Sequence, residues 1–272
     1  MNIWAAVMLA TMLSAGQSPE VPTTKRCWNL LDEAIHDKNP DVRKDAAESV
    51  SLLPVNQQVL SRLESMLHDP DVTVRKAVVS TLGDVKGKRT IPLLKQALSD
   101  PVPEVRFTAA KVLYHLQDPE GEQFLLAVVE GESKAASGYL SSKERTAFRM
   151  LHTPTKLFMF AAVQAAGFVP VPGLGMGISS AQGILANPDS SARASALLLL
   201  AHSQDAALGD AVASALGAKQ WSERAAAAHV VATHPFPNLR PRLIPLLDDK
   251  KWAVRLRSAA AYIRLGETPA AK

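Results

Sequence analysis

The chain has 272 residues, of which 47% are hydrophobic and 21% are charged, a composition typical of a globular domain or an extended array. Only 5% of the residues are aromatic, so the core would consist mainly of alanine, valine and leucine, which suits closely packed helices better than a β-sandwich. The net charge of +4 is too small to indicate nucleic-acid binding unless it is concentrated on one face. We therefore expect an all-α protein without a nucleic-acid partner.

The N-terminus has the pattern of a signal peptide. Residues 3–13 are apolar, and the small residues Ser14, Ala15 and Gly16 that follow suit cleavage before Gln17. The apolar run is shorter than the roughly 20 residues of a membrane-spanning helix. We predict a signal peptide over 1–16 and export to the bacterial periplasm or the medium; an uncleaved anchor and a core helix are the alternatives. The single Cys27 cannot form an intramolecular disulfide, so stability would come from packing.

A motif that ends in arginine recurs along residues 24–131 and 187–265. DPDVTVR at 69–75 is one copy, and successive arginines are 32, 31, 87, 31 and 31 residues apart. The six positions are Arg43, Arg75, Arg106, Arg193, Arg224 and Arg255. Small or apolar residues lie three, four and seven positions after each arginine, which marks one face of an α-helix. Asp69, Asp100 or Asn187 could cap these helices, and the following proline suits a first helical position.

Second amphipathic segments, such as QQVLSRLESML at 57–67, lie between these helices. Each unit is thus predicted to be two antiparallel helices, which bury their apolar faces only by stacking on neighbouring units. The leading segment CWNLLDEAI at 27–35 looks like the second helix of an incomplete first unit. We predict an α-solenoid of about six two-helix repeats, with a concave side formed by the second helices.

The pattern D/N-P-x-x-x-V-R, followed by an alanine pair and then leucine, resembles the short HEAT repeats of the phycobilisome-lyase type. The resemblance covers roughly 24–131 and 187–265. It implies that the aspartate and arginine positions link neighbouring units, so that the six arginines form an internal structural ladder; a binding surface is the alternative. Trp221 and Trp252, each three residues before its arginine, would pack on the adjacent unit or form an exposed aromatic contact patch.

Residues 132–186 interrupt the repeats. A polar stretch comes first, and no charged residue occurs from Leu157 to Pro188. We favour an apolar helical hairpin packed on the solenoid. The alternatives are a surface for a partner or apolar ligand and interfacial insertion into a bilayer through 157–186. The basic side chains that precede or begin this hairpin would form an exposed partner-binding strip: Lys143, Arg145, Arg149 and Lys156.

Motifs for catalysis or cofactor binding are scarce. The dipeptides His36-Asp37 and His68-Asp69 occupy equivalent places in consecutive repeats and have side chains that can bind metals, but capping already explains the aspartates. No G-x-S-x-G nucleophile elbow occurs. We predict no catalytic, cofactor-binding or metal-binding residues.

The sequence thus favours a non-enzymatic, exported scaffold that presents a curved helical surface to an unidentified protein partner. The main alternative is a membrane-surface protein, with peripheral membrane contact through an anchor at 157–186. A bilin-lyase-like or metal-dependent enzyme is a lesser alternative, because repeat architecture by itself does not determine activity.

Overall fold

The computed structural model describes residues 20–85, 88–129, 181–185, 187–201, 203, 205, 207–234 and 236–267. Every regular element in these ranges is a helix, which confirms the predicted all-α fold. The helices of the N-terminal half are α1 (Glu20–Ile35), α2 (Pro40–Val50), α3 (Gln57–Met66), α4 (Val72–Asp84), η1 (Lys88–Thr90), α5 (Ile91–Ala97), α6 (Pro103–His115) and α7 (Pro119–Val129). Those of the C-terminal half are α10 (Gln182–Leu185), α11 (Ala192–Leu199), α12 (Ala207–Ala215), α13 (Trp221–Thr233), η4 (Pro237–Asp248) and α14 (Trp252–Glu267).

Local sequence explains how these helices begin. Asn39 caps α2 by accepting a hydrogen bond from the N–H of Asp41, with Pro40 in the first turn. Asp71 caps α4, so the expectation that Asp69 is its cap was wrong. Asp69 instead accepts a hydrogen bond from the N–H of Asp71 at 2.8 Å, because it lies two positions before the capping residue and does not reach the first turn of α4. Asp100 and Asn187 are not caps either, because they accept hydrogen bonds from the N–H groups of Val102 and Asp189. These side chains therefore shape the turn that precedes each helix.

One predicted second helix takes a different form. The segment that contains Pro241 and Pro245 folds as the 3₁₀ helix η4, whereas its apolar pattern predicts an amphipathic helix. Proline has no N–H and crowds the preceding turn, so two prolines four residues apart prevent a regular α-helix. The tighter 3₁₀ form still buries Leu239 and Leu243.

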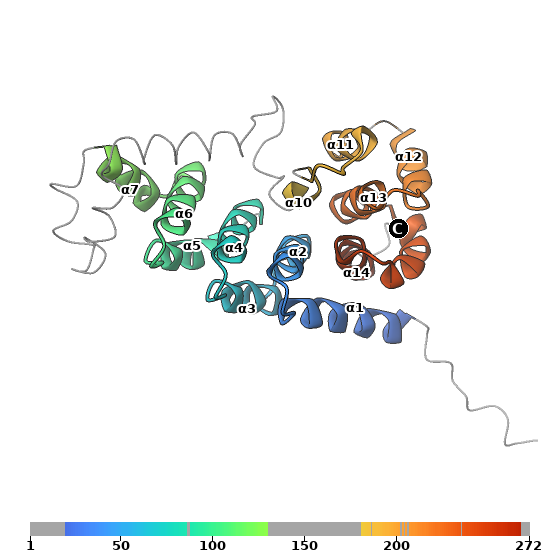
Figure 1. The fold of residues 1–272 in the computed structure, drawn as a ribbon, viewed down its shortest axis with the longest axis horizontal. Helices are drawn as coiled ribbons and strands as arrows, with labels where there is room; N and C mark the ends of the chain where they lie inside the picture. Colours follow the sequence, from blue (N-terminus) through green and yellow to red (C-terminus); the bar gives the residue numbers. More distant parts are fainter. Residues whose placement is uncertain are drawn as a thin grey trace, which may run out of the picture.

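The two halves join into one continuous array in an order that differs from the sequence. The first helices of the repeats pack side by side in the order α11, α13, α14, α2, α4, α6 (Figure 1). Helix α3 packs against α2 and α4, and α1 packs in the same manner against α14 and α2. Helix α1 is thus the second helix of a repeat whose first helix is α14. The incomplete first unit is completed by the far end of the chain.

The array is curved, with the first helices on its inner side. Figure 1 shows α2, α4 and α6 facing α11 and α13 across the inside of the curve, while α1, α3 and α12 lie outside. The expectation that the second helices form the concave side was therefore wrong. The first helices approach one another closely because their contact faces carry small residues, all fully buried: Ala46, Ala47, Ala109, Ala110, Ala227 and Ala228.

Candidate functional site

The repeat arginines bind the turns of neighbouring units. In three of them the guanidinium donates two hydrogen bonds to the aspartate of the next repeat: Arg43 to Asp69 at 2.6 and 2.8 Å, Arg75 to Asp100 at 2.7 and 3.1 Å, and Arg224 to Asp249 at 2.6 and 3.1 Å. Each also donates through Nη1 to carbonyls of its own turn. These bidentate, charge-assisted bonds fix both register and orientation between neighbouring repeats.

The other three repeat arginines lie in different surroundings. Arg106 is fully buried and donates to the carbonyl of Asp100 at 2.7 Å. Arg193 is about half exposed and pairs with Glu223 at 3.2 Å. Arg255 stacks on Trp252, with its Cζ 3.6 Å from the ring centroid. Trp221 and Trp252 are both partly buried against the core.

The remaining predicted site residues do not form a common site in the part of the chain that is described. The basic strip of Lys143, Arg145, Arg149 and Lys156 lies outside the described residues, as does most of 157–186. His36 Nδ1 lies 2.8 Å from the carbonyl of Asp32, and His68 Nε2 lies 3.1 Å from the amide of Gln96. Across the described ranges, no three His, Cys, Asp or Glu side chains gather where they could hold a metal ion.

Two further observations concern the predicted chemistry and the predicted membrane contact. Cys27 is fully buried, and this burial raises the pKa of its thiol to about 12, so it is not a thiolate nucleophile at neutral pH. Within the described residues, no helix is both long and apolar enough to cross a bilayer.

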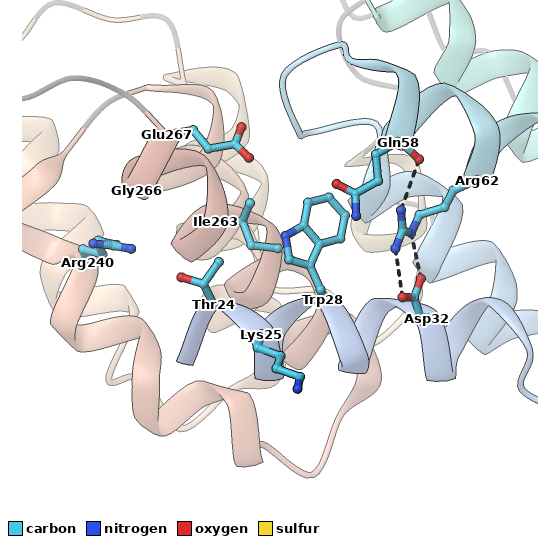
Figure 2. A pocket seen from close by; sticks show the side chains of 10 residues that line it. All are labelled: Thr24, Lys25, Trp28, Asp32, Gln58, Arg62, Arg240, Ile263, Gly266 and Glu267. Atoms are coloured by element: carbon cyan, nitrogen blue, oxygen red, sulfur yellow. Dashed lines mark hydrogen bonds and ion pairs between the residues drawn. The ribbon is translucent and has the colours of Figure 1, made fainter. Parts of the chain in front are cut away.

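A pocket of 540 Å³ opens on the outer side of the array, where the two halves of the chain meet (Figure 2). Helices α1 and α3 supply one part of its wall, and η4 and α14 supply the other. Its lining residues are Thr24, Lys25, Trp28, Asp32, Gln58, Arg62, Arg240, Ile263, Gly266 and Glu267. The pocket exists only because α14 packs against α1.

Trp28 lies at the centre of this pocket, beside an ion pair that holds Arg62 in place. The Cζ of Arg62 is 4.6 Å from the centroid of the Trp28 ring, a cation–π distance. Asp32 accepts two hydrogen bonds from Arg62, at 2.7 and 2.8 Å, and the carbonyl of Gln58 accepts a third at 3.2 Å. Arg62 is thereby fixed before any ligand arrives.

The opposite wall is built from η4 and the end of α14. Arg240 stacks on Tyr262, with its Cζ 4.2 Å from the ring centroid, and donates through Nε to the carbonyl of Tyr262 at 3.2 Å. A Cβ atom at Gly266 would collide with the guanidinium of Arg240, so glycine leaves room for this cation. Figure 2 shows Ile263 between Arg240 and Trp28.

On the inner side of the same junction, α14 and α2 are joined by a buried ion pair. Arg257 donates a hydrogen bond through Nη2 to Glu48, and both side chains are at most 1% exposed. Asp45 Oδ1 lies 3.4 Å from Nη1 of Arg257, and Nζ of Lys44 lies 3.9 Å from Oε1 of Glu48. Burial, and to a lesser degree the charge of Asp45, raises the pKa of Glu48 to about 7, against the opposing effect of Arg257.

Three more contacts close the junction. Arg264 of α14 donates to the carbonyl of Leu52, in the turn that follows α2, and Arg26 of α1 pairs with Asp248 of η4. Gly183 of α10 lies against the buried pair, because a Cβ atom there would be 2.8 Å from Glu48 Oε2. The contacts at this junction thus differ from the arginine–aspartate hydrogen bonds that link consecutive repeats.

Comparison with known proteins identifies the repeat. The sequence matches the family model of HEAT repeats over residues 28–102 and 60–136. Residues 28–136 therefore contain HEAT repeats. No curated protein matches the sequence. A similar solved structure is human deoxyhypusine hydroxylase in complex with glycerol, with 15% identity, a TM-score of 0.36 and coverage of 93% of this chain and 100% of that chain. The phycobilisome-lyase subtype stays a prediction.

The HEAT repeats matched by the family model lie in the N-terminal half, yet the C-terminal half repeats their geometry. Arg224 binds Asp249 with the same two hydrogen bonds that Arg43 forms with Asp69.

Sequence reasoning missed the pocket residues Trp28, Arg62 and Arg240 as a group. The available signal was a first unit without a first helix and a last unit without a second one.

Proposed function

We propose that this HEAT array is a non-enzymatic scaffold that binds another protein through the outer face where its two halves meet. The observation that carries the proposal is the pocket around Trp28, whose wall comes from both halves of the chain. Stacked helical repeats form extended surfaces that are widely used for binding. A partner at this pocket would contact α1 and α14 together and would stabilise the packing of the two halves against each other.

The chemistry of the pocket supports a protein as its ligand. Tryptophan and arginine are the residue types most enriched among the side chains that dominate protein–protein binding energy. A volume of 540 Å³ lies within the range of pockets that enclose a small ligand or a few side chains. Because Arg62 is already held by Asp32, it loses little conformational freedom when a partner binds.

The proposal includes export. It is supported by the apolar run at 3–13 and by the small residues at 14–16, a pattern typical of cleaved signal peptides. N-terminal sequencing of the protein isolated from its host checks this part. A mature protein that begins at Gln17 is expected, and one that retains the leading residues would contradict export by cleavage.

Site-specific photo-crosslinking in the host tests the scaffold function. A benzophenone amino acid replaces Gln58 at the pocket rim, and in a matched control it replaces Gln123 on α7; both glutamines are exposed. We expect a discrete crosslinked protein from position 58 only. Purified partner and full chain are then mixed, and Trp28→Ala is expected to weaken binding by about tenfold or more.

Trp28 packs partly against the core, so a second variant separates binding from folding. Gln58→Arg changes only an exposed rim side chain and should alter partner affinity without changing the melting temperature. A partner that crosslinks equally at positions 58 and 123, or that binds both variants like the unmodified protein, would contradict the proposal.

A further inference from the structure

The turns that precede the six first helices lie along one edge of the array, which we call the turn edge. Within the N-terminal half, Arg43 at the start of α2 binds Asp69 in the turn before α4. Within the C-terminal half, Arg224 at the start of α13 binds Asp249 in the turn before α14. Each of these bonds joins the start of one first helix to the turn before the next, so neighbouring first helices begin at the same edge.

The turn edge continues across the junction between the two halves. Arg257 of α14 and Asp45 of α2 each lie two positions after a repeat arginine, and their Nη1 and Oδ1 atoms are 3.4 Å apart. Arg264 and Leu52 each lie nine positions after a repeat arginine, and a hydrogen bond joins them. Contacts at matching positions near both ends require α14 and α2 to run parallel. The turns before all six first helices therefore share one edge.

The C-terminal half of the turn edge is basic. Lys251 Nζ lies 6.0 Å from the ring centroid of Trp221, and Arg255 stacks on Trp252, so two cations are held over aromatic rings. Asp189 is the carboxylate of these turns that has no ion pair within the described residues, whereas the other carboxylates bind arginines. Four cations of the same turns have no ion pair there either: Lys219, Lys250, Lys251 and Arg255.

The N-terminal half of the same edge is acidic. Its repeat arginines do not offset this charge, because Arg43 and Arg75 are bound to aspartates and Arg106 is fully buried. Lys38 is the exposed cation of these turns. Against it stand four carboxylates that form no ion pair within the described residues: Asp37, Asp41, Asp71 and Glu104. The two halves of the turn edge thus carry opposite charge.

These opposite charges lie on the two arms of the curved array, with three first helices on each arm (Figure 1). A two-fold axis that lies in the turn edge and passes between α14 and α2 would turn a second copy over and exchange its arms. The basic turns of each copy then face the acidic turns of the other, and this contact occurs twice. Such a pairing is closed, because both copies use the same surface.

We infer that the turn edge binds a second copy of this chain, with the basic turns of one copy against the acidic turns of the other. The dimer goes beyond the proposed scaffold function, because the pocket around Trp28 opens on the outer side of the array. Complementary charge fixes orientation and speeds association, whereas each exposed ion pair adds little affinity. The dimer therefore depends on many weak pairs and is sensitive to salt.

Sedimentation equilibrium of the full chain tests the inference. We expect a monomer–dimer equilibrium whose dissociation constant rises at least about tenfold between about 50 and 500 mM salt, since exposed charges are screened. Lys250→Glu combined with Lys251→Glu should weaken the dimer at least about tenfold, because like charges then face each other twice. The matched control is Lys88→Glu combined with Arg89→Glu, two exposed cations of η1 at the other ends of the first helices. This control should dimerise like the unmodified protein.

A charge reversal in the acidic half supplies the decisive comparison. Asp41→Lys, at an exposed position, should also weaken self-association. Mixing this variant with the Lys250→Glu, Lys251→Glu variant should restore association. One contact of the mixed dimer is unaltered, and the other pairs the introduced carboxylates with the introduced lysine. Because misfolded chains would not regain binding on mixing, the recovery separates an effect on the interface from an effect on folding.

Four outcomes would overturn the inference. They are a monomer throughout the concentration series at low salt, species larger than a dimer, equal weakening in the η1 control, and an Asp41→Lys variant that dimerises like the unmodified protein. The last outcome would indicate that the basic turns bind a different anionic partner. The scaffold function is judged separately, because crosslinking at position 58 reports on the pocket and not on the turn edge.

Discussion

Arg257 in α14 donates a hydrogen bond to Glu48 in α2 across a separation of 209 residues in the chain. Both side chains are almost completely buried, and they lie where the C-terminal half meets the N-terminal half. At the boundaries between consecutive repeats the corresponding link is an arginine–aspartate pair, such as Arg75 and Asp100. The central boundary of the array therefore depends on a charge pair that occurs nowhere in the repeat motif.

Removing one partner of this pair should destabilise the protein strongly. Glu48→Leu removes the buried carboxylate that Arg257 contacts and leaves the more distant Asp45 as the acidic side chain of this cluster, and we expect a loss of about 3–5 kcal/mol in the free energy of unfolding. The double variant Glu48→Leu with Arg257→Leu should recover much of this loss, because no buried charge remains. Urea denaturation followed by circular dichroism measures both. A double variant less stable than the single one would contradict this account.

The raised pKa of Glu48 gives the junction a defined pH dependence. Between its ordinary value near 4.3 and about 7, the folded protein keeps a proton that the unfolded chain releases. The stabilisation that Glu48 adds to the free energy of unfolding is therefore complete at low pH and is lost as the pH rises through about 7. Glu48→Gln does not titrate. The stability of the variant relative to the unmodified protein should rise between about pH 5 and 7.5 by roughly 1–3 kcal/mol.

Melting temperatures of both proteins over this pH range provide the measurement. Glu223→Gln, a change in a partly buried carboxylate that pairs with exposed Arg193, serves as the control and should follow the unmodified protein. A constant difference between the Glu48→Gln and unmodified proteins across the range would show that Glu48 does not titrate there.

The two halves should stay together after the chain is cut. A protease recognition site inserted between residues 140 and 141 gives one fragment that contains α1 to α7 and another that contains α10 to α14. Because α14 packs against α1 and α2, we expect both fragments to elute together in size-exclusion chromatography after cleavage. Arg257→Glu, which places two carboxylates in contact, should release them. Separate elution of the unmodified fragments would contradict the composite repeat.

The repeat arginines should differ in energetic importance according to their burial. Arg75 is 9% exposed and bound to Asp100, so Arg75→Met should leave a buried carboxylate without its partner and cost about 2–4 kcal/mol. Arg193 is 47% exposed, and Arg193→Met should cost less than about 1 kcal/mol. Chemical denaturation of the two variants checks the contrast. Equal losses of unfolding free energy in the two variants would show that burial does not decide how much each arginine contributes to stability.

The helices could be predicted because their periodicity is local. The spacing after Arg43 or Arg224 places small residues on one face, and these residues are buried in the structure. The caps were partly wrong, since one residue separates a turn-forming Asp69 from a capping Asp71, and sequence pattern alone does not resolve that difference. The assignment of the concave side to the second helices was also wrong, because the direction of curvature depends on how first helices pack on one another rather than on any single repeat.

The pocket could not be predicted from the sequence. Trp28 and Arg62 belong to the first units, whereas Arg240 and Ile263 lie near the end of the described chain. Their proximity depends on the packing of α14 against α1, which no periodic pattern encodes. The basic residues that the sequence favours, Lys143 to Lys156, lie outside the described residues, so that prediction stands as it was made.

The composite repeat of α1 and α14 also constrains how the array forms during synthesis. Consecutive repeats can stack as soon as they leave the ribosome, and α1 can pack against α2, but its contact with α14 forms only after α14 has been translated. Cys27 and Leu31 of α1 are fully buried in the finished protein, and the side of α1 that contacts α14 stays uncovered until that helix is made. Such late, long-range closure slows folding and exposes apolar surface meanwhile. The packing of α1 is therefore completed later than that of α3, whose neighbours α2 and α4 are adjacent in the sequence.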